Sequence, residues 1–94
     1  MMCRIELFGV PRLLAGTNAV PLDLRAPATL ADAIEGLAAA SPPLVGSVVR
    51  PDRRSLTAGY VVCRDGREFL RDLDTAIASD DCLLLFATAA GGMV

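Results

Sequence analysis

The sequence contains no histidine and no lysine, and its three cysteines, Cys3, Cys63 and Cys82, stand far apart without any Cys-x-x-Cys motif. The absence of histidine excludes the usual metal sites and Cys–His nucleophile pairs. Each cysteine lies in an apolar strand pattern, so we interpret all three as small core residues. We therefore expect no metal site, no bound cofactor, no catalytic residues and no enzyme activity of the chain's own.

All nine basic residues are arginines, and the formal net charge is −2. Arg50, Arg53 and Arg54 lie close together, but Asp52 stands among them and no aromatic residue flanks them, which favours a solvated loop over a phosphate site. No apolar run approaches the roughly 20 residues that span a bilayer. Residues 1–6 carry charges where a signal peptide would be apolar. We therefore expect a cytoplasmic protein with neither a nucleic-acid nor a membrane partner.

The first half of the chain has two strand patterns and one helical pattern. Of the 94 residues, 53% are hydrophobic, which indicates one packed domain over residues 1–94. Alternation over residues 3–8 and 19–25 predicts a hairpin, and Pro21 places its second strand at a sheet edge. Helical spacing predicts a helix at about 29–40, with Thr29 as its N-cap and Asp32 in its first turn.

The second half contains the strongest strand signal. Residues 44–56 predict a short helical or irregular segment, and strands are expected at 60–63 and 68–70, on either side of an Asp65-Gly66 turn. Leu73 and Ile77 are expected to be core anchors in a loop. The apolar run at 82–87 predicts a central strand parallel to the first strand. The order of elements indicates an α+β fold, a β-grasp (ubiquitin-like) roll with a mixed sheet of four to five strands and one main helix packed on one face.

One face of the last strand must point away from the helix. The sequence leaves two alternatives for it, Leu84 with Phe86 or Leu83 with Leu85, because strand parity can slip by one residue. With Phe8, these side chains predict a partner interface, and we assign it to Phe8, Leu84 and Phe86. The alternative for Phe86 is a place in the core.

Residues 88–94 follow this strand and are expected to form a tail, with two glycines at Gly91 and Gly92. Glycine has no Cβ, so the pair can pass through a narrow channel and let another protein approach the backbone closely.

The chain resembles the MoaD/ThiS sulfur-carrier family of ubiquitin-like proteins. The likeness runs over nearly the full length and depends on the order of elements and the diglycine rather than on one motif. The stretches that carry it are Leu7-Phe8-Gly9, Thr29-Leu30, residues 72–81 and Ala90-Gly91-Gly92.

The resemblance implies a carrier whose terminal glycine, Gly92, becomes a thiocarboxylate. In this family an ATP-dependent adenylating enzyme activates the carboxylate, and sulfur then replaces the adenylate. The carrier hands the sulfur to a recipient synthase that makes molybdopterin, thiamine, cysteine or a secondary metabolite. ATP is used by the partner enzyme, and Ala90 and Gly91 would carry Gly92 into the partner's active site.

Met93 and Val94 depart from the family pattern, in which the chain ends at the second glycine. We expect a processing peptidase, similar to the zinc-dependent peptidases related to deubiquitinases, to remove them. The alternative is a member that has lost the chemistry and kept the fold. Two other functions also stay open, a ubiquitin-like protein modifier and a β-grasp binding module that uses no tail chemistry.

Overall fold

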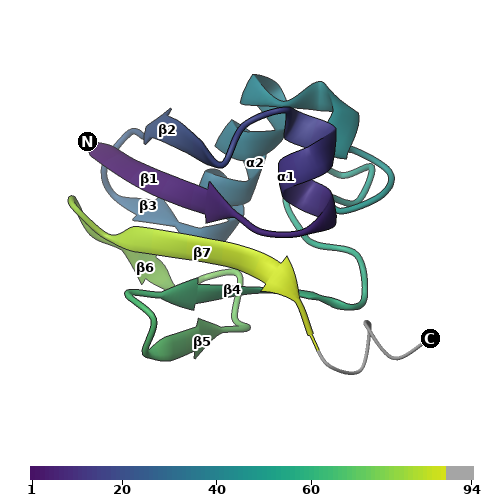
Figure 1. Ribbon diagram of the computed structural model, residues 1–94. Helices are drawn as coiled ribbons and strands as arrows, with labels where there is room; N and C mark the ends of the chain where they lie inside the picture. Colours follow the sequence, from purple (N-terminus) through teal and green to yellow (C-terminus); the bar gives the residue numbers. More distant parts are fainter. Residues whose placement is uncertain (89–94) are drawn as a thin grey trace.

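The computed structural model describes residues 1–88, which form two sheets and two α-helices (Figure 1). A five-stranded sheet has the order β2-β1-β7-β4-β5, and a two-stranded sheet joins β3 to β6. The elements are β1 (Met2–Leu7), α1 (Val10–Ala15), β2 (Ala19–Asp23), β3 (Ala28–Thr29), α2 (Leu30–Ala40), the 3₁₀ helix η1 (Pro42–Leu44), β4 (Tyr60–Arg64), β5 (Glu68–Leu70), β6 (Ala76–Ile77) and β7 (Cys82–Ala87).

The last strand lies in the middle of the five-stranded sheet, as its apolar sequence predicts. β7 pairs in parallel with β1 and antiparallel with β4, while β1 with β2 and β4 with β5 are antiparallel. Helix α2 covers one face of this sheet (Figure 1). The mixed sheet with one main helix on one face confirms the predicted fold class.

Helix α2 begins at Leu30 because Thr29 and Asp32 form a reciprocal capping box. The Asp32 N–H donates to Thr29 Oγ1 at 3.3 Å, and the Thr29 N–H donates to the Asp32 carboxylate at 2.9 Å. Two further N–H groups at this helix start, those of Leu30 and Ala31, donate to the carbonyls of Thr75 and Leu73. The predicted N-cap is confirmed, and the helix start is also held by a segment more than forty residues further along the chain.

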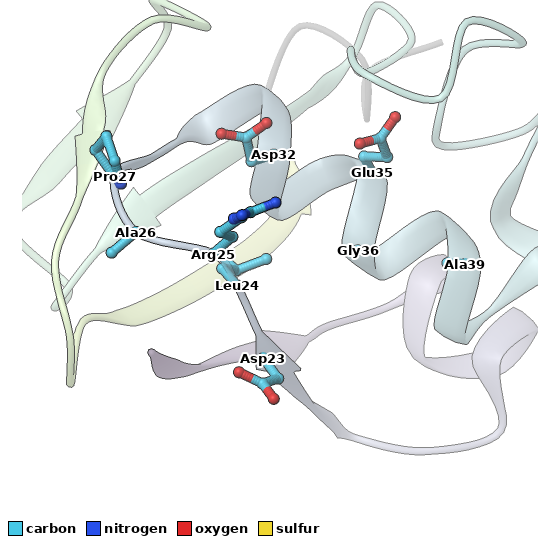
Figure 2. A pocket seen from close by; sticks show the side chains of 9 residues that line it. All are labelled: Asp23, Leu24, Arg25, Ala26, Pro27, Asp32, Glu35, Gly36 and Ala39. Carbon is cyan, nitrogen blue, oxygen red and sulfur yellow. The ribbon is translucent and has the colours of Figure 1, made fainter.

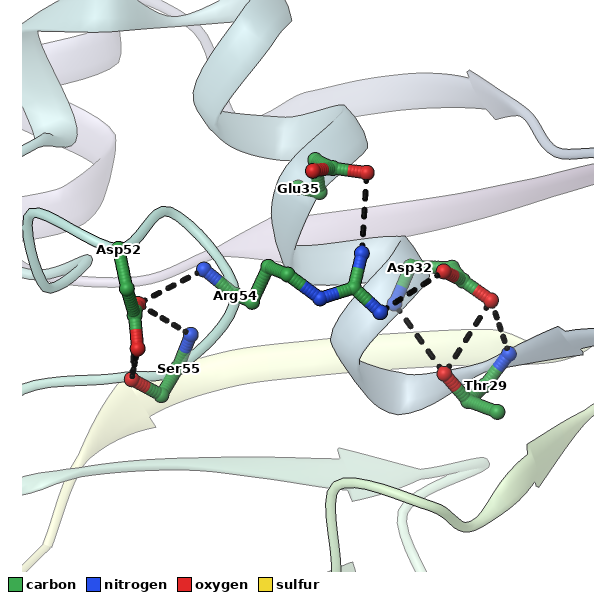
Figure 3. Close-up of polar contacts among 6 residues, drawn as sticks. All are labelled: Thr29, Asp32, Glu35, Asp52, Arg54 and Ser55. Atoms are coloured by element: carbon green, nitrogen blue, oxygen red, sulfur yellow. Dashed lines mark hydrogen bonds and ion pairs between the residues drawn. The ribbon is translucent and has the colours of Figure 1, made fainter.

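The long connection between η1 and β4 has buried valines on its inner side and an ion-paired arginine on its outer side. Val48 and Val49, which belong to this connection, are fully buried. On its outer side, Arg54 reaches across to α2 and pairs with Asp32 at 3.2 Å and with Glu35 at 3.1 Å (Figure 3). Arg50, Arg53 and Arg54 are all exposed, as the solvated-loop interpretation predicts.

Three local features differ from the sequence predictions. The expected connection of the first hairpin contains a short helix, α1, started by Pro11 at its first turn. The residues just before α2 and a segment shortly before β7 form the two-stranded sheet β3-β6, and strands of two residues are too short to show a period in the sequence. Ile77 is buried, but the prediction for Leu73 is wrong, because Leu73 is 37% exposed.

No helix within residues 1–88 is long and apolar enough to cross a membrane.

Replacing Thr29 by alanine tests the capping box. The change removes the hydroxyl that accepts from the Asp32 N–H, and we expect the free energy of unfolding to fall by about 1 kcal/mol. Urea denaturation followed by circular dichroism measures this. Ser79→Ala is the matched control, because Ser79 is exposed and its hydroxyl makes no hydrogen bond within residues 1–88. Equal stability of the two variants would contradict the capping role.

The pH dependence of stability tests Asp32 in a second way. The hydrogen bond from the Thr29 backbone, and to a smaller extent Arg54, holds the pKa of Asp32 below its ordinary value. A lowered folded-state pKa contributes stability above the unfolded value of about 3.9, and this is lost as the pH falls through the folded pKa. We therefore expect the stability gap between the natural chain and Asp32→Asn to be constant above about pH 5 and to shrink below about pH 4. A stability difference that widens as the pH falls would contradict this role of the Asp32 carboxylate.

Candidate functional site

The face of the five-stranded sheet turned away from α2 carries the candidate interface, and we call it the outer face. Leu83 and Leu85 have no exposed surface and belong to the core, whereas Leu84 and Phe86 are partly exposed. Successive side chains of a strand alternate between faces. Of the two alternatives that the sequence leaves open, the structure therefore selects Leu84 with Phe86 for the outer face.

Phe8 extends this face beyond the end of β1. Its N–H donates to the Leu85 carbonyl at 3.1 Å, so the parallel pairing of β1 with β7 continues one residue past Leu7. The Phe8 side chain is 45% exposed. Because Leu7 pairs with Leu85, Phe8 comes next to Phe86 on the outer face.

Phe69, on β5, is a member of this face that the sequence analysis missed. It is 56% exposed and meets the Phe86 ring edge-on, with 6.1 Å between ring centroids and an interplanar angle of 63°. The Arg71 guanidinium lies 5.9 Å from the centre of the Phe69 ring. The strand register puts Phe69 on the same face as Leu84, because Phe69 pairs with Cys63 and Cys63 pairs with Leu84. The signal that could have identified Phe69 is therefore the register across the Asp65-Gly66 turn. We call Phe8, Phe69, Leu84 and Phe86 together the outer apolar surface.

A charged cluster borders this surface at the start of β7. Arg4 pairs with Glu6 at 3.0 Å, and the Cys82 thiol donates to the same Glu6 oxygen at 3.0 Å. This hydrogen bond raises the pKa of Cys82 and lowers the pKa of Glu6, because it joins a neutral thiol to a carboxylate. Cys3 and Cys63 are buried as predicted, and burial raises the pKa of Cys3. The core prediction is wrong for Cys82, which is partly exposed and polar in its contacts.

The chain leaves the sheet beside Phe86. The Thr88 N–H donates to the Gly59 carbonyl at 2.7 Å, which extends the pairing of β7 with β4 by one residue. The described chain therefore ends between its two neighbouring strands, next to the outer apolar surface. Of the predicted tail, residues 88–94, the structure describes only Thr88, and residues 89–94, which include Ala90, Gly91, Gly92, Met93 and Val94, lie outside the described residues.

A hollow of about 590 Å³ lies on the other side of the molecule, between the Asp23–Pro27 segment and α2 (Figure 2). Arg25 extends from this segment toward the helix (Figure 2). The two carboxylates of α2 that line it, Asp32 and Glu35, are already paired with Arg54. Within residues 1–88 no group of three or more Cys, Asp or Glu side chains is arranged to hold a metal ion.

Solved structures of other proteins share the fold over almost the whole chain. SAMP1 from Haloferax volcanii is 33% identical, with a TM-score of 0.83, over 98% of this chain and 100% of that one. A putative molybdopterin converting factor, subunit 1, from Pyrococcus furiosus is 20% identical, with a TM-score of 0.73, over 95% and 99% of the two chains. Mycobacterium tuberculosis CysO is also 20% identical, with a TM-score of 0.70, over 93% and 99%.

No protein-family model and no curated protein sequence matches the chain. The two structures at 20% identity show the fold alone. SAMP1, a small archaeal modifier protein, shares a third of its residues with this chain over 98% of this chain and 100% of that one. On this evidence the chain belongs to the MoaD/ThiS family of ubiquitin-like β-grasp sulfur carriers and modifiers, together with SAMP1.

Proposed function

We propose that this chain is a sulfur carrier, and that Gly92 carries the sulfur as a thiocarboxylate. The observation that carries the proposal is the path of β7, which runs through the centre of the sheet and leaves it at Thr88, four residues before Gly92. Four extended residues reach about 14 Å at most. An enzyme that takes up Gly92 must therefore also approach the end of β7 and the outer apolar surface beside it.

The chemistry needs a free carboxylate on Gly92. One carboxylate oxygen attacks the α-phosphorus of ATP and releases pyrophosphate, giving an acyl adenylate. A sulfur nucleophile at the oxidation level of sulfide then displaces AMP and leaves a thiocarboxylate. Both steps take place on the adenylating enzyme, which binds the ATP, and a recipient synthase later takes the sulfur.

Met93 and Val94 follow Gly92 in the sequence, so the Gly92–Met93 peptide bond has to be hydrolysed first. We assign this step to a separate processing peptidase. Water adds to the Gly92 carbonyl carbon, the amine of Met93 leaves, and Gly92 gains the carboxylate that the adenylating enzyme requires.

The outer apolar surface is the proposed docking site for the adenylating enzyme and the recipient synthase. Phe8, Leu84, Phe86 and Phe69 form a connected aromatic and aliphatic area next to the point where the chain leaves the sheet. Aromatic side chains that keep a large exposed area on a packed sheet provide the anchors that protein interfaces commonly use.

A protein modifier is the second candidate function, and the likeness to a small archaeal modifier protein favours it. In this function the activated Gly92 acyl group is passed to an amine of another protein and AMP leaves. The activation step and the docking surface are the same, and the two functions differ in the nucleophile that takes the acyl group.

Thiocarboxylate formation tests the first proposal directly. A chain ending at Gly92 is incubated with the adenylating enzyme of the source cell, ATP and a sulfide source, and is then treated with iodoacetamide. We expect the intact mass to show exchange of one oxygen for one sulfur, and the C-terminal peptide to be alkylated. The chain without Gly92 is the control, because its cysteines are alkylated in the same way while the cysteine-free C-terminal peptide released by cleavage after Phe86 should stay unmodified.

The same reaction with the chain that retains Met93 and Val94 should give no product until the peptidase is added. Modification of the C-terminal peptide in that uncut chain would contradict the processing step. Covalent adducts between Gly92 and amines of other proteins, without sulfur on the C-terminal peptide, would favour the modifier function.

The outer apolar surface is tested by Phe86→Arg. Burial of a large apolar side chain contributes about 1.5–3 kcal/mol, so we expect the dissociation constant for the adenylating enzyme to rise about 10- to 100-fold. Titration calorimetry gives the constant, and circular dichroism checks the fold. Leu13→Arg is the matched control, because Leu13 is exposed on α1 and lies outside this surface. An unchanged dissociation constant for Phe86→Arg would contradict the assigned interface, and an unfolded variant would place Phe86 in the core.

A further inference from the structure

The two edges of the five-stranded sheet differ in what they offer to another strand. At the β2 edge, the bonds from Leu24 to Met1 and from Leu7 to Asn18 fix which residues face β1. In an antiparallel ladder the residues between them point their peptide groups outward, and here these are Ala19, Pro21 and Asp23. Pro21 has no N–H, and the Ala19 N–H already donates to Thr17 Oγ1. This edge is closed to a further strand.

The β5 edge is open by the same reasoning. The bonds from Asp65 to Cys82 and from Thr88 to Gly59 show that the odd-numbered residues of β4 face β7, so Val62 and Arg64 face β5. Their partners on β5 are Leu70 and Glu68, which leaves the N–H and C=O of Phe69 directed to the free edge. Within residues 1–88, Phe69 makes no backbone hydrogen bond outside the strand ladder.

A groove of about 280 Å³ lies beside this edge, on the face that α2 covers. Its lining is largely apolar and comes from four parts of the chain: α2, the loop before β4, the start of β4, and the end of β5 with the residues after it. The apolar residues that line it include Leu30, Ile34, Leu56, Leu70 and Leu73. Leu73, which the sequence predicted to be a core residue, is partly exposed because it forms part of the wall of this groove.

Two arginines without ion-pair partners border the groove. Arg50 and Arg71 both line it and are exposed, and neither takes part in an ion pair within residues 1–88, whereas Arg4, Arg54 and Arg64 all do. Arg50 uses its Nε to donate to the Leu56 carbonyl, which holds its guanidinium over the groove wall. None of the described residues that line the groove is acidic. Of the six arginines that form no ion pair within residues 1–88, Arg50 and Arg71 lie at this apolar groove.

We propose that the β5 edge and this groove bind an extended segment of a partner protein in which apolar residues alternate with Asp or Glu. The segment would pair with the N–H and C=O of Phe69 and add a strand to the sheet. Side chains on its helix-facing side would enter the groove beside Leu70, and those on the other side would lie next to Arg71, which stands above the Phe69 ring. Alternation of apolar and acidic side chains matches these two environments.

This site is separate from the tail chemistry and does not depend on it. Phe69 offers its side chain to the outer apolar surface and its peptide groups to the edge.

The test uses a blocked eight-residue peptide in which Val alternates with Asp, titrated into the ¹⁵N-labelled full chain. We expect amide shift changes at Phe69, Leu70 and Leu73, and slower hydrogen exchange of the Phe69 amide. Arg71→Ala should raise the dissociation constant about two- to fivefold, the range for one exposed charge pair. Arg67→Ala is the matched control and should leave the constant unchanged, because Arg67 is exposed on the β4–β5 turn and lies outside the groove.

A peptide with Lys in place of each Asp separates charge recognition from adhesion to an apolar groove. Equal binding of the two peptides would overturn the proposal. So would the absence of shift changes at millimolar peptide, or shift changes centred on Leu84 and Phe86 rather than on β5. The tail reactions of Gly92 take no part in this titration, so its outcome is independent of whether the chain carries sulfur.

Discussion

The pairing of β7 with both of its neighbours is the constraint on which the rest of the structure depends. β7 pairs in parallel with β1 and antiparallel with β4. Its alternation sends Leu83 and Leu85 into the core beneath α2 and leaves Leu84 and Phe86 on the outer face. A strand that is apolar on both sides needs a helix on one side and offers a docking surface on the other. The same strand thus supplies the core, the proposed interface and the point at which the chain leaves the sheet.

Those parts of the fold that depend on long patterns could be predicted from the sequence. Six alternating residues define β1, the apolar run defines β7, and helical spacing after Thr29 defines α2. Pro21 could be placed at an edge because a residue without an N–H cannot sit inside a ladder. In each case the signal comes from covalent chemistry or from a period repeated several times, and tertiary contacts do not reverse it.

The remaining features depend on contacts that no short pattern contains. Helix α1 is six residues long, and β3 and β6 have two residues each, too few for a period. The outward position of Phe69 follows from its register with Cys63, and the partial exposure of Leu73 from the groove that it borders. The choice between Leu84 and Leu83 likewise required the register of β7, because a shift of one residue exchanges the two faces.

The start of α2 is completed by the carbonyls of Leu73 and Thr75, which lie in the last third of the chain. During synthesis the helical segment emerges first, and its opening turn lacks these two acceptors until the later segment has been made. The parallel partner of β1 is made later still, since it is the final strand. A chain without its carboxyl-terminal third would therefore lack both acceptors at the start of α2 and the strand that joins β1 to β4 in the native sheet.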